Sequence, residues 1–234
     1  MRTAASSIAA IIASLLVVVP AARPQDDASE QRAIAVCPGF ALWVEAQKAA
    51  AARRPQQAPP PDAPALSSLR TELLAMQVDD QRVRESPQGG PPPMQPLLDV
   101  DARHLPRIKA IVEKYGFPTR AQIESDGMTA AWLLVQHATR DPAFQARVLK
   151  QIEPRVKSGE IGGEQFALLT DRVLILNEHK RQRYGSQLDY VDGRYIASPV
   201  EDAARVDAWR AQFGMAPLQD YVCFVNALQS RAPH

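Results

Sequence analysis

Apolar residues recur at helical spacing along most of the chain. Ile108, Ile111 and Val112 lie on one helical face, which predicts a helix that begins at Pro106 and ends at Gly116. The same spacing, read together with capping residues, predicts further helices over 34–54, 66–85, 128–138, 142–153, 164–180, 199–214 and 218–229. The consistency of these local patterns predicts a mainly α fold, a multi-helix, bundle-like domain.

One segment departs from the helical pattern. Asp192-Gly193 is a favoured hairpin turn, and Tyr190 and Tyr195 on either side of it suit short strands. We therefore expect one short β-hairpin near residues 187–197.

The first residues have the layout of a secretory signal peptide. Arg2 gives a positive start, the apolar run from Ile8 to Val19 is too short to span a bilayer, and Val19-Pro20-Ala21 fits the small-residue rule for cleavage. We expect cleavage after residue 21, export to the periplasm or beyond the cell, and no stable membrane span in the mature chain.

Two proline-rich stretches, 55–64 and 87–96, divide the N-terminal half and are predicted to be extended connectors. The predicted organisation is a signal peptide over 1–21, an N-terminal helix and Pro-rich linker over 22–65, and a helical domain over 66–230.

Charge and cysteine content narrow the expectations further. Lys and Arg number 27 against 26 Asp and Glu, so the net charge gives no reason to expect nucleic acid as a partner. Cys37 and Cys223 are the two cysteines. Export permits a disulfide between them, although two unpaired cysteines packed as small apolar groups are the alternative.

Polar side chains interrupt two helices that are otherwise apolar nearly all round, 128–138 and 166–176. The interrupting residues are Gln136, His137, Asp171 and Arg172. A helix that is apolar on every side is buried, so its polar groups must be paired or hydrogen-bonded. Asp80 and Arg84 at i, i+4 form a further candidate pair, and the segment 182–187 follows the second helix as a polar turn. These groups are either structural supports or the lining of a site.

Five motifs contain these residues. They are Asp80-Gln81-x-x-Arg84, Gly116-Phe117-Pro118, Leu134-Val135-Gln136-His137-Ala138, Ala167-Leu168-Leu169-Thr170-Asp171-Arg172-Val173 and Gln182-Arg183-Tyr184-Gly185-Ser186-Gln187. Together they resemble a bacterial domain of unknown function, family 6624, over about residues 69–222. Phe117 replaces a usual Trp, and Ser186 replaces a usual Thr. The resemblance implies that the polar residues are family features, and it implies no activity.

The candidate chemistry is incomplete for an enzyme. His137 would be the general base or acid, oriented by Asp171 or Asp80, and the anion-holding cation would be Arg172 or Arg84. A convincing nucleophile is missing, because the chain has no G-x-S-x-G motif and nothing places Ser186 beside His137.

Cofactor and metal motifs are missing as well. The chain lacks a Gly-rich phosphate loop, H-E-x-x-H and paired Cys motifs, and His104, His179 and His234 lie outside the matched motifs. We therefore expect no cofactor and no metal.

The favoured hypothesis is an exported protein that binds a polar ligand or an envelope protein. The predicted ligand-binding residues are Asp80, Gln81, Arg84, Gln136, Arg172, Gln182, Tyr184 and Gln187, with His137 and Asp171 as the catalytic candidates. A hydrolase-like enzyme with His137 as general base, and a purely structural polar cluster, are the alternatives.

Overall fold

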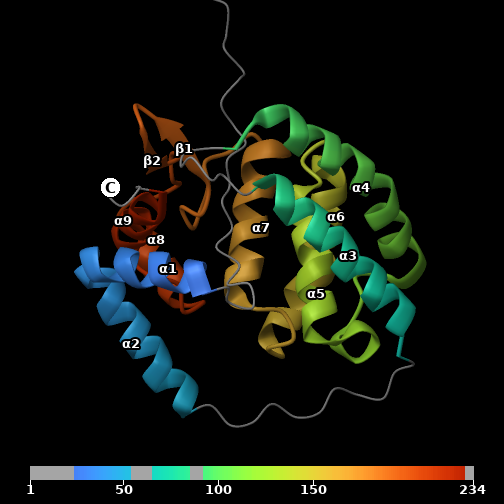
Figure 1. Cartoon of the computed structure of the whole chain (residues 1–234), viewed down its shortest axis with the longest axis horizontal. Coiled ribbons are helices and arrows are strands. Elements are labelled where there is room, and N and C mark those ends of the chain that lie inside the picture. Colours follow the sequence, from blue (N-terminus) through green and yellow to red (C-terminus); the bar gives the residue numbers. More distant parts are fainter. Residues whose placement is uncertain (1–23, 54–64, 85–91, 230–234) are drawn as a thin grey trace, which may run out of the picture.

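The computed structural model describes residues 24–53, 65–84 and 92–229. The predicted signal peptide and the predicted connector over 55–64 lie outside these ranges. Nine helices and one two-stranded antiparallel hairpin make up the described residues, which confirms the mainly α prediction (Figure 1). None of these helices is long and apolar enough to cross a bilayer.

The helices in chain order are α1 (Pro24–Val36), α2 (Pro38–Ala52), α3 (Ser67–Arg84), α4 (Met94–Tyr115), α5 (Arg120–His137), α6 (Pro142–Lys157), α7 (Gly163–Leu176), α8 (Val206–Ala211) and α9 (Leu218–Gln229). Strands β1 (Leu188–Val191) and β2 (Arg194–Ala197) form the hairpin, and Val191 pairs with Arg194 across the predicted turn.

Helix α5 is the centre of the main core, where it contacts α3, α4, α6 and α7. Nearly every residue from Met128 to His137 is buried, as the all-round apolar pattern predicts. Trp132 fills the interior, and its indole nitrogen donates to the Gln165 carbonyl across the contact with α7. Any polar side chain near the end of α5 therefore lies inside the protein.

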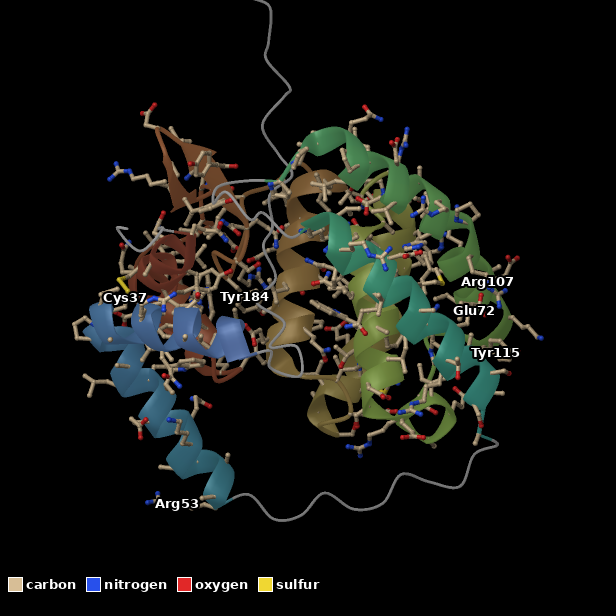
Figure 2. All side chains as sticks on the ribbon, in the orientation of Figure 1. Cys37, Arg53, Glu72, Arg107, Tyr115 and Tyr184 are labelled. Carbon is tan, nitrogen blue, oxygen red and sulfur yellow. A yellow bond between two sulfur atoms is a disulfide. The ribbon has the colours of Figure 1, made fainter. Side chains whose placement is uncertain are left out.

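Helix α4 corrects the prediction for the segment around Pro106. It begins at Met94, so Pro106 lies inside the helix, and Pro96 lies in its first turn rather than in an extended connector. An interior proline costs a helix one hydrogen bond and several kcal/mol. Burial of the face that carries Leu97 and Ile108 outweighs that cost, because apolar burial contributes about 1.5–3 kcal/mol per large side chain. Outside the core, Arg107 pairs with Glu72 and joins α4 to α3 (Figure 2).

Two other predicted helices are broken or shortened. The predicted helix over 34–54 is two helices that meet at Cys37, because a residue before proline is sterically disfavoured in the helical region. The predicted helix over 199–214 is reduced to α8. The backbone of Gln182 binds both the Pro199 carbonyl and the Glu201 amide, which holds the first residues of that segment extended.

The remaining helices differ from prediction mainly at their ends. The predicted capping box of Thr119 and Gln122 is present, but its short turn continues into α5 through a kink at Glu124, where φ is 57°. Helix α6 runs past Pro154 to Lys157, and α7 ends at Leu176 rather than at residue 180. Helices α3 and α9 agree closely with prediction.

A second apolar cluster joins the two ends of the described chain. Helices α1 and α2 pack against α9, and the predicted Cys37–Cys223 disulfide is present between them (Figures 1 and 2). Phe40 stacks on Phe224 with ring centroids 4.0 Å apart. The N-terminal helices are therefore tied to the end of the helical domain both covalently and by packing.

The disulfide predicts a measurable contribution to stability. It closes a loop with a sequence separation of 186 residues, so its loss frees a large part of the unfolded chain. We expect replacement of Cys37 and Cys223 by Ser to lower the free energy of unfolding by about 2–5 kcal/mol in urea titrations. A reducing agent should destabilise the parent by a similar amount and leave the variant unchanged. Equal stability of parent and variant would contradict the prediction.

Candidate functional site

A buried cluster of charged groups lies where α3, α4 and α5 meet, and we call Asp80, Arg84, Asp101 and His137 the Asp80 cluster. Asp80 and Arg84 come from the last turns of α3, Asp101 comes from α4, and His137 is the last residue of α5. The apolar face of α3 packs on α5 through Leu69 and Leu73, which brings Asp80, two turns further along α3, to His137.

The carboxylate of Asp80 is saturated with hydrogen bonds. The Nδ1 atom of His137 lies 2.9 Å from each carboxylate oxygen. Arg84 donates from Nε and Nη2 at 3.1 and 2.9 Å, and Gln81 donates at 2.8 Å. The Nη2 atom of Arg84 also donates to Asp101, so one guanidinium bridges two carboxylates. The predicted Asp80–Arg84 pair is thus confirmed.

Burial keeps His137 neutral, and the donors around Asp80 keep its carboxyl ionised. Burial alone would raise the pKa of Asp80, but the hydrogen bond from His137 and the Arg84 guanidinium outweigh burial, so the pKa falls well below its ordinary value. Burial lowers the pKa of His137 to about 4. The charge of Asp80 opposes this shift, and the charges of Arg84 and Arg172 add to it. The neutral ring therefore carries its proton on Nδ1 and donates it to Asp80.

The other ring nitrogen of His137 is left without a partner. Nε2 is buried and has no hydrogen bond to any described residue, and the His137 side chain is only 5% exposed. With Nδ1 protonated, Nε2 offers a lone pair in a fixed direction. Leaving such an acceptor unpaired costs about 1–3 kcal/mol, so this atom is available to a ligand's donor or to a proton.

Asp101 and His104 extend the cluster along α4, and the sequence analysis assigned neither of them to a site. Burial raises the pKa of Asp101 to about 6, and the nearby charge of Asp80 adds to the shift while Arg84 opposes it. Burial also lowers the pKa of His104, whose Nδ1 atom is buried without a partner among the described residues.

A sequence signal for these two residues existed. On a helix that starts at Met94, Asp101 and His104 follow Leu97 at i+4 and i+7 and precede Ile108, so they fall on the buried stripe. Because the helix was predicted to start at Pro106, Asp101 and His104 fell outside it and this spacing was not recognised.

Arg172 on α7 lies next to the Asp80 cluster but pairs with neutral groups. Its Nη1 atom donates to the Gln136 carbonyl at 2.7 Å, and Nε and Nη2 donate to Oε1 of Gln187 at 3.2 and 3.0 Å. Burial lowers its pKa to about 10, which still leaves the group charged at neutral pH. Among the described residues, no carboxylate forms a salt bridge with this guanidinium.

Asp171 supports a separate turn rather than His137. Its carboxylate accepts bonds from the backbone amides of Arg183, Tyr184 and Ser186 and from the Ser186 hydroxyl, at 2.7 to 3.2 Å. Burial raises the pKa of this carboxyl, and the donated bonds oppose that shift. We call residues 182–187 together with Asp171 the Asp171 turn. The structure thus selects Asp80, rather than Asp171, as the partner of His137.

The predicted ligand-binding residues divide between these two places. Asp80, Gln81, Arg84 and His137 are brought together. Arg172 and Gln187 bind each other, and Arg172 contacts α5 at the Gln136 carbonyl.

Three of the predicted residues are engaged elsewhere. Gln182 binds the backbone of Gln187 and Ser198. The ring of Tyr184 packs with Phe213, and Gln136 donates weakly to the Leu168 carbonyl while its Oε1 has no partner among the described residues.

The Asp80 cluster contains three potential metal ligands, since one ligand atom from each of Asp80, Asp101 and His137 lies within 4.8 Å of the others. The Arg84 guanidinium already binds both carboxylates, and the Nδ1–H of His137 points at Asp80. A cation placed among these atoms would have to displace Arg84 and deprotonate Nδ1. We therefore assign no metal to the cluster.

Comparison with known proteins gives one match. A model described as "Family of unknown function (DUF6624)" matches residues 67–230. The chain belongs to the DUF6624 family. The DUF6624 match includes both the Asp80 cluster and the Asp171 turn and leaves α1 and α2 outside. No curated protein and no solved structure matches the chain.

We expect substitution of Asp171 to lower the stability of the protein without affecting His137. In Asp171→Asn the new side chain would turn an amide NH₂ group toward backbone N–H donors, so we expect the free energy of unfolding in urea to fall by about 2–4 kcal/mol. The exposed Asp192→Asn should change it by less than about 0.5 kcal/mol. Because Asp171 does not contact His137, the nitrogen chemical shifts of the His137 ring should stay unchanged in Asp171→Asn. A shifted His137 resonance would mean that the two centres are coupled.

Asp101 predicts a pH dependence. Between its ordinary value of 3.8 and about 6 the folded protein holds a proton that the unfolded chain has released, so this group makes stability fall as pH rises through that window. Asn cannot titrate. The stability of Asp101→Asn relative to the parent should therefore increase from pH 4 to pH 6, by at most about 3 kcal/mol.

The exposed Asp99→Asn on the same helix is the matched control, and it should change the free energy of unfolding by less than about 0.5 kcal/mol. The His137 contribution has the opposite sign but is common to parent and variant, so it cancels in the difference. Parallel unfolding curves for the parent and Asp101→Asn across this range would refute the raised pKa.

Proposed function

We propose that the chain is an exported protein that binds a small polar ligand at the Asp80 cluster, with Nε2 of His137 accepting a hydrogen bond from the ligand. One observation carries the proposal: Nε2 is buried and unpaired, while Nδ1 is fixed by Asp80. A structural histidine would be expected to have both nitrogens satisfied.

The surroundings of His137 support a preorganised acceptor. Asp80 is held by Arg84 and Gln81, so it cannot swing away from Nδ1 without breaking several bonds. This shell fixes the tautomer and the direction of the ring, as outer partners do for functional histidines. The ligand would then meet an acceptor whose geometry is set before binding.

Burial favours a small molecule over an envelope protein as the occupant. Within the cluster, the Arg84 side chain is 13% exposed and those of Asp80 and Asp101 are 1% and 3% exposed. A protein partner needs an extended accessible surface, which these side chains do not offer. The Arg84 edge is the part of the cluster nearest to solvent.

Export is supported by the disulfide as well as by the N-terminal sequence. Disulfides form and persist in oxidising compartments and are rare where thiols are kept reduced. The Cys37–Cys223 bond therefore agrees with the predicted signal peptide.

The Asp80–His137 pair also favours a second candidate, a hydrolase-like enzyme in which Nε2 removes a proton from water or from a substrate. A protein nucleophile is harder to find. The Ser186 hydroxyl donates to Asp171 and accepts from Gln187, and no contact joins it to His137 among the described residues. Ligand binding needs no nucleophile and remains the better supported proposal.

The proposal predicts that the substitution His137→Asn removes ligand binding and leaves folding intact. In His137→Asn the new amide nitrogen can still donate to Asp80, but no acceptor remains at the position of Nε2. The parent should be stabilised by a member of a panel of sugars, amino acids, hydroxy acids and nucleotides. At one hundred times the dissociation constant the gain is about 2.7 kcal/mol, or roughly 5–10 °C in Tm. The variant should fold with a Tm near that of the parent and lose this shift.

His179→Asn is the matched control, because His179 is exposed and has a φ of 53°, which Asn tolerates. It should keep the ligand response. A response of His137→Asn equal to that of the parent would refute the proposed role of Nε2. A destabilised variant together with no response of the parent to the panel would support the purely structural alternative.

A further inference from the structure

We propose that the ligand is a small monocarboxylate that also carries a hydroxyl or amine, with its carboxylate on Arg172 and its donor group on Nε2 of His137. This inference rests on the proposed function and names the class of molecule that the site would select.

Arg172 has no carboxylate counter-charge in contact with it among the described residues. A buried guanidinium normally pairs with a carboxylate, because taking an unpaired charge out of water is costly. Here the forked contact from Nε and Nη2 goes to the amide oxygen of Gln187, a neutral group of the same shape as a carboxylate arm. Asp101 influences Arg172 only through space, since its own contact is with Arg84.

Arg172 has N–H donors beyond those that its partners among the described residues use. A guanidinium has five N–H groups, and the bonds to Gln187 and Gln136 use three of them. One N–H on Nη1 and one on Nη2 have no acceptor among the described residues. Two N–H groups on neighbouring nitrogens match the two oxygens of a carboxylate, which Arg binds bidentately.

Arg172 lies close to His137. Arg172 binds the carbonyl of Gln136, the residue that precedes His137 on the last turn of α5. The charge of Arg172 also contributes to the lowered pKa of His137. A ligand bound at Nη1 and Nη2 would therefore lie near the imidazole.

The chemistry of Nε2 then excludes a plain carboxylate as the best ligand. Because Nδ1 carries the ring proton, Nε2 presents a lone pair, and two acceptors facing each other repel. A hydroxyl or amine on the ligand would donate to Nε2 while the carboxylate accepts from Arg172. A site that hydrogen-bonds a ligand hydroxyl discriminates strongly against an analogue that lacks it.

The charges nearby favour a single negative charge. Asp80 and Asp101 lie in the same cluster, and both repel an incoming anion. A doubly charged phosphate would meet this repulsion twice over, whereas a monocarboxylate needs only the one cation that lacks a carboxylate partner.

The test uses four probes on the mature full chain: lactate, propionate, 1,2-propanediol and inorganic phosphate. Lactate carries both features, propionate carries the charge alone, and propanediol carries the donors alone. We expect the dissociation constant for lactate, from calorimetry and thermal shift, to be at least tenfold lower than for each of the others.

The decisive variant is Gln187→Glu, which would supply Arg172 with a carboxylate of its own. We expect its affinity for lactate to fall at least tenfold. Its Tm is not diagnostic, because Glu cannot replace the bonds that the Gln187 amide donates to the Leu168 carbonyl and the Ser186 hydroxyl. Gln219→Glu, an exposed change of the same charge, should leave both properties as in the parent. A folded Gln187→Glu protein with unchanged lactate affinity would overturn the role of Arg172.

The probes also separate this inference from the proposed function. Propanediol binding as tightly as lactate, and lost in His137→Asn, would overturn the carboxylate and leave the proposed function standing. Propionate binding as tightly as lactate would overturn the donor. Tighter phosphate binding would overturn the single charge. No binding of lactate to the parent would overturn the inference, while the broader ligand panel with His137→Asn still decides the proposed function.

Discussion

The carboxylate of Asp80 joins three helices at one point. It receives His137 from α5 and Arg84 from α3, and Arg84 in turn holds Asp101 on α4. Removal of Arg84 would leave two carboxylates buried without their cation, and removal of Asp80 would leave Nδ1 of His137 without its acceptor. The ends of α3 and α5 and the middle of α4 are therefore fixed relative to one another by electrostatics as well as by apolar packing.

This arrangement explains why His137 differs from an ordinary core histidine. Asp80 stabilises one tautomer, while burial and two guanidinium groups keep a second proton off the ring. The result is a basic nitrogen inside the protein that stays neutral at physiological pH. The Asp171 turn lacks this property, because every donor that faces its carboxylate is already matched to an oxygen. The two polar centres thus differ. The hydrogen bonds of the Asp171 carboxylate are satisfied, whereas Nε2 of His137 in the Asp80 cluster has no partner among the described residues.

The sequence predicted much of the fold and part of the site, for identifiable reasons. Helix α5 was predictable because its residues are apolar on every side, and the same pattern singled out His137. The partner of His137 was undecided between Asp80 and Asp171, since only tertiary packing determines which distant carboxylate arrives. Asp101 was missed because a local proline rule was applied to a helix whose burial overrides it. The break at Cys37 had its own local cause in Pro38, which the apolar spacing around it concealed.

The disulfide limits the order in which the parts of the protein can assemble. Cys37 belongs to the first pair of described helices and Cys223 to the last helix, so their cluster needs both extremes of the described chain. Because synthesis proceeds from the N-terminus, α1 and α2 are made before α9, the helix that they pack against. Until α9 is made, α1 and α2 lack their packing partner, whereas α3 to α7 can already assemble. The Cys37–Cys223 disulfide can therefore form only after the chain has been synthesised through α9.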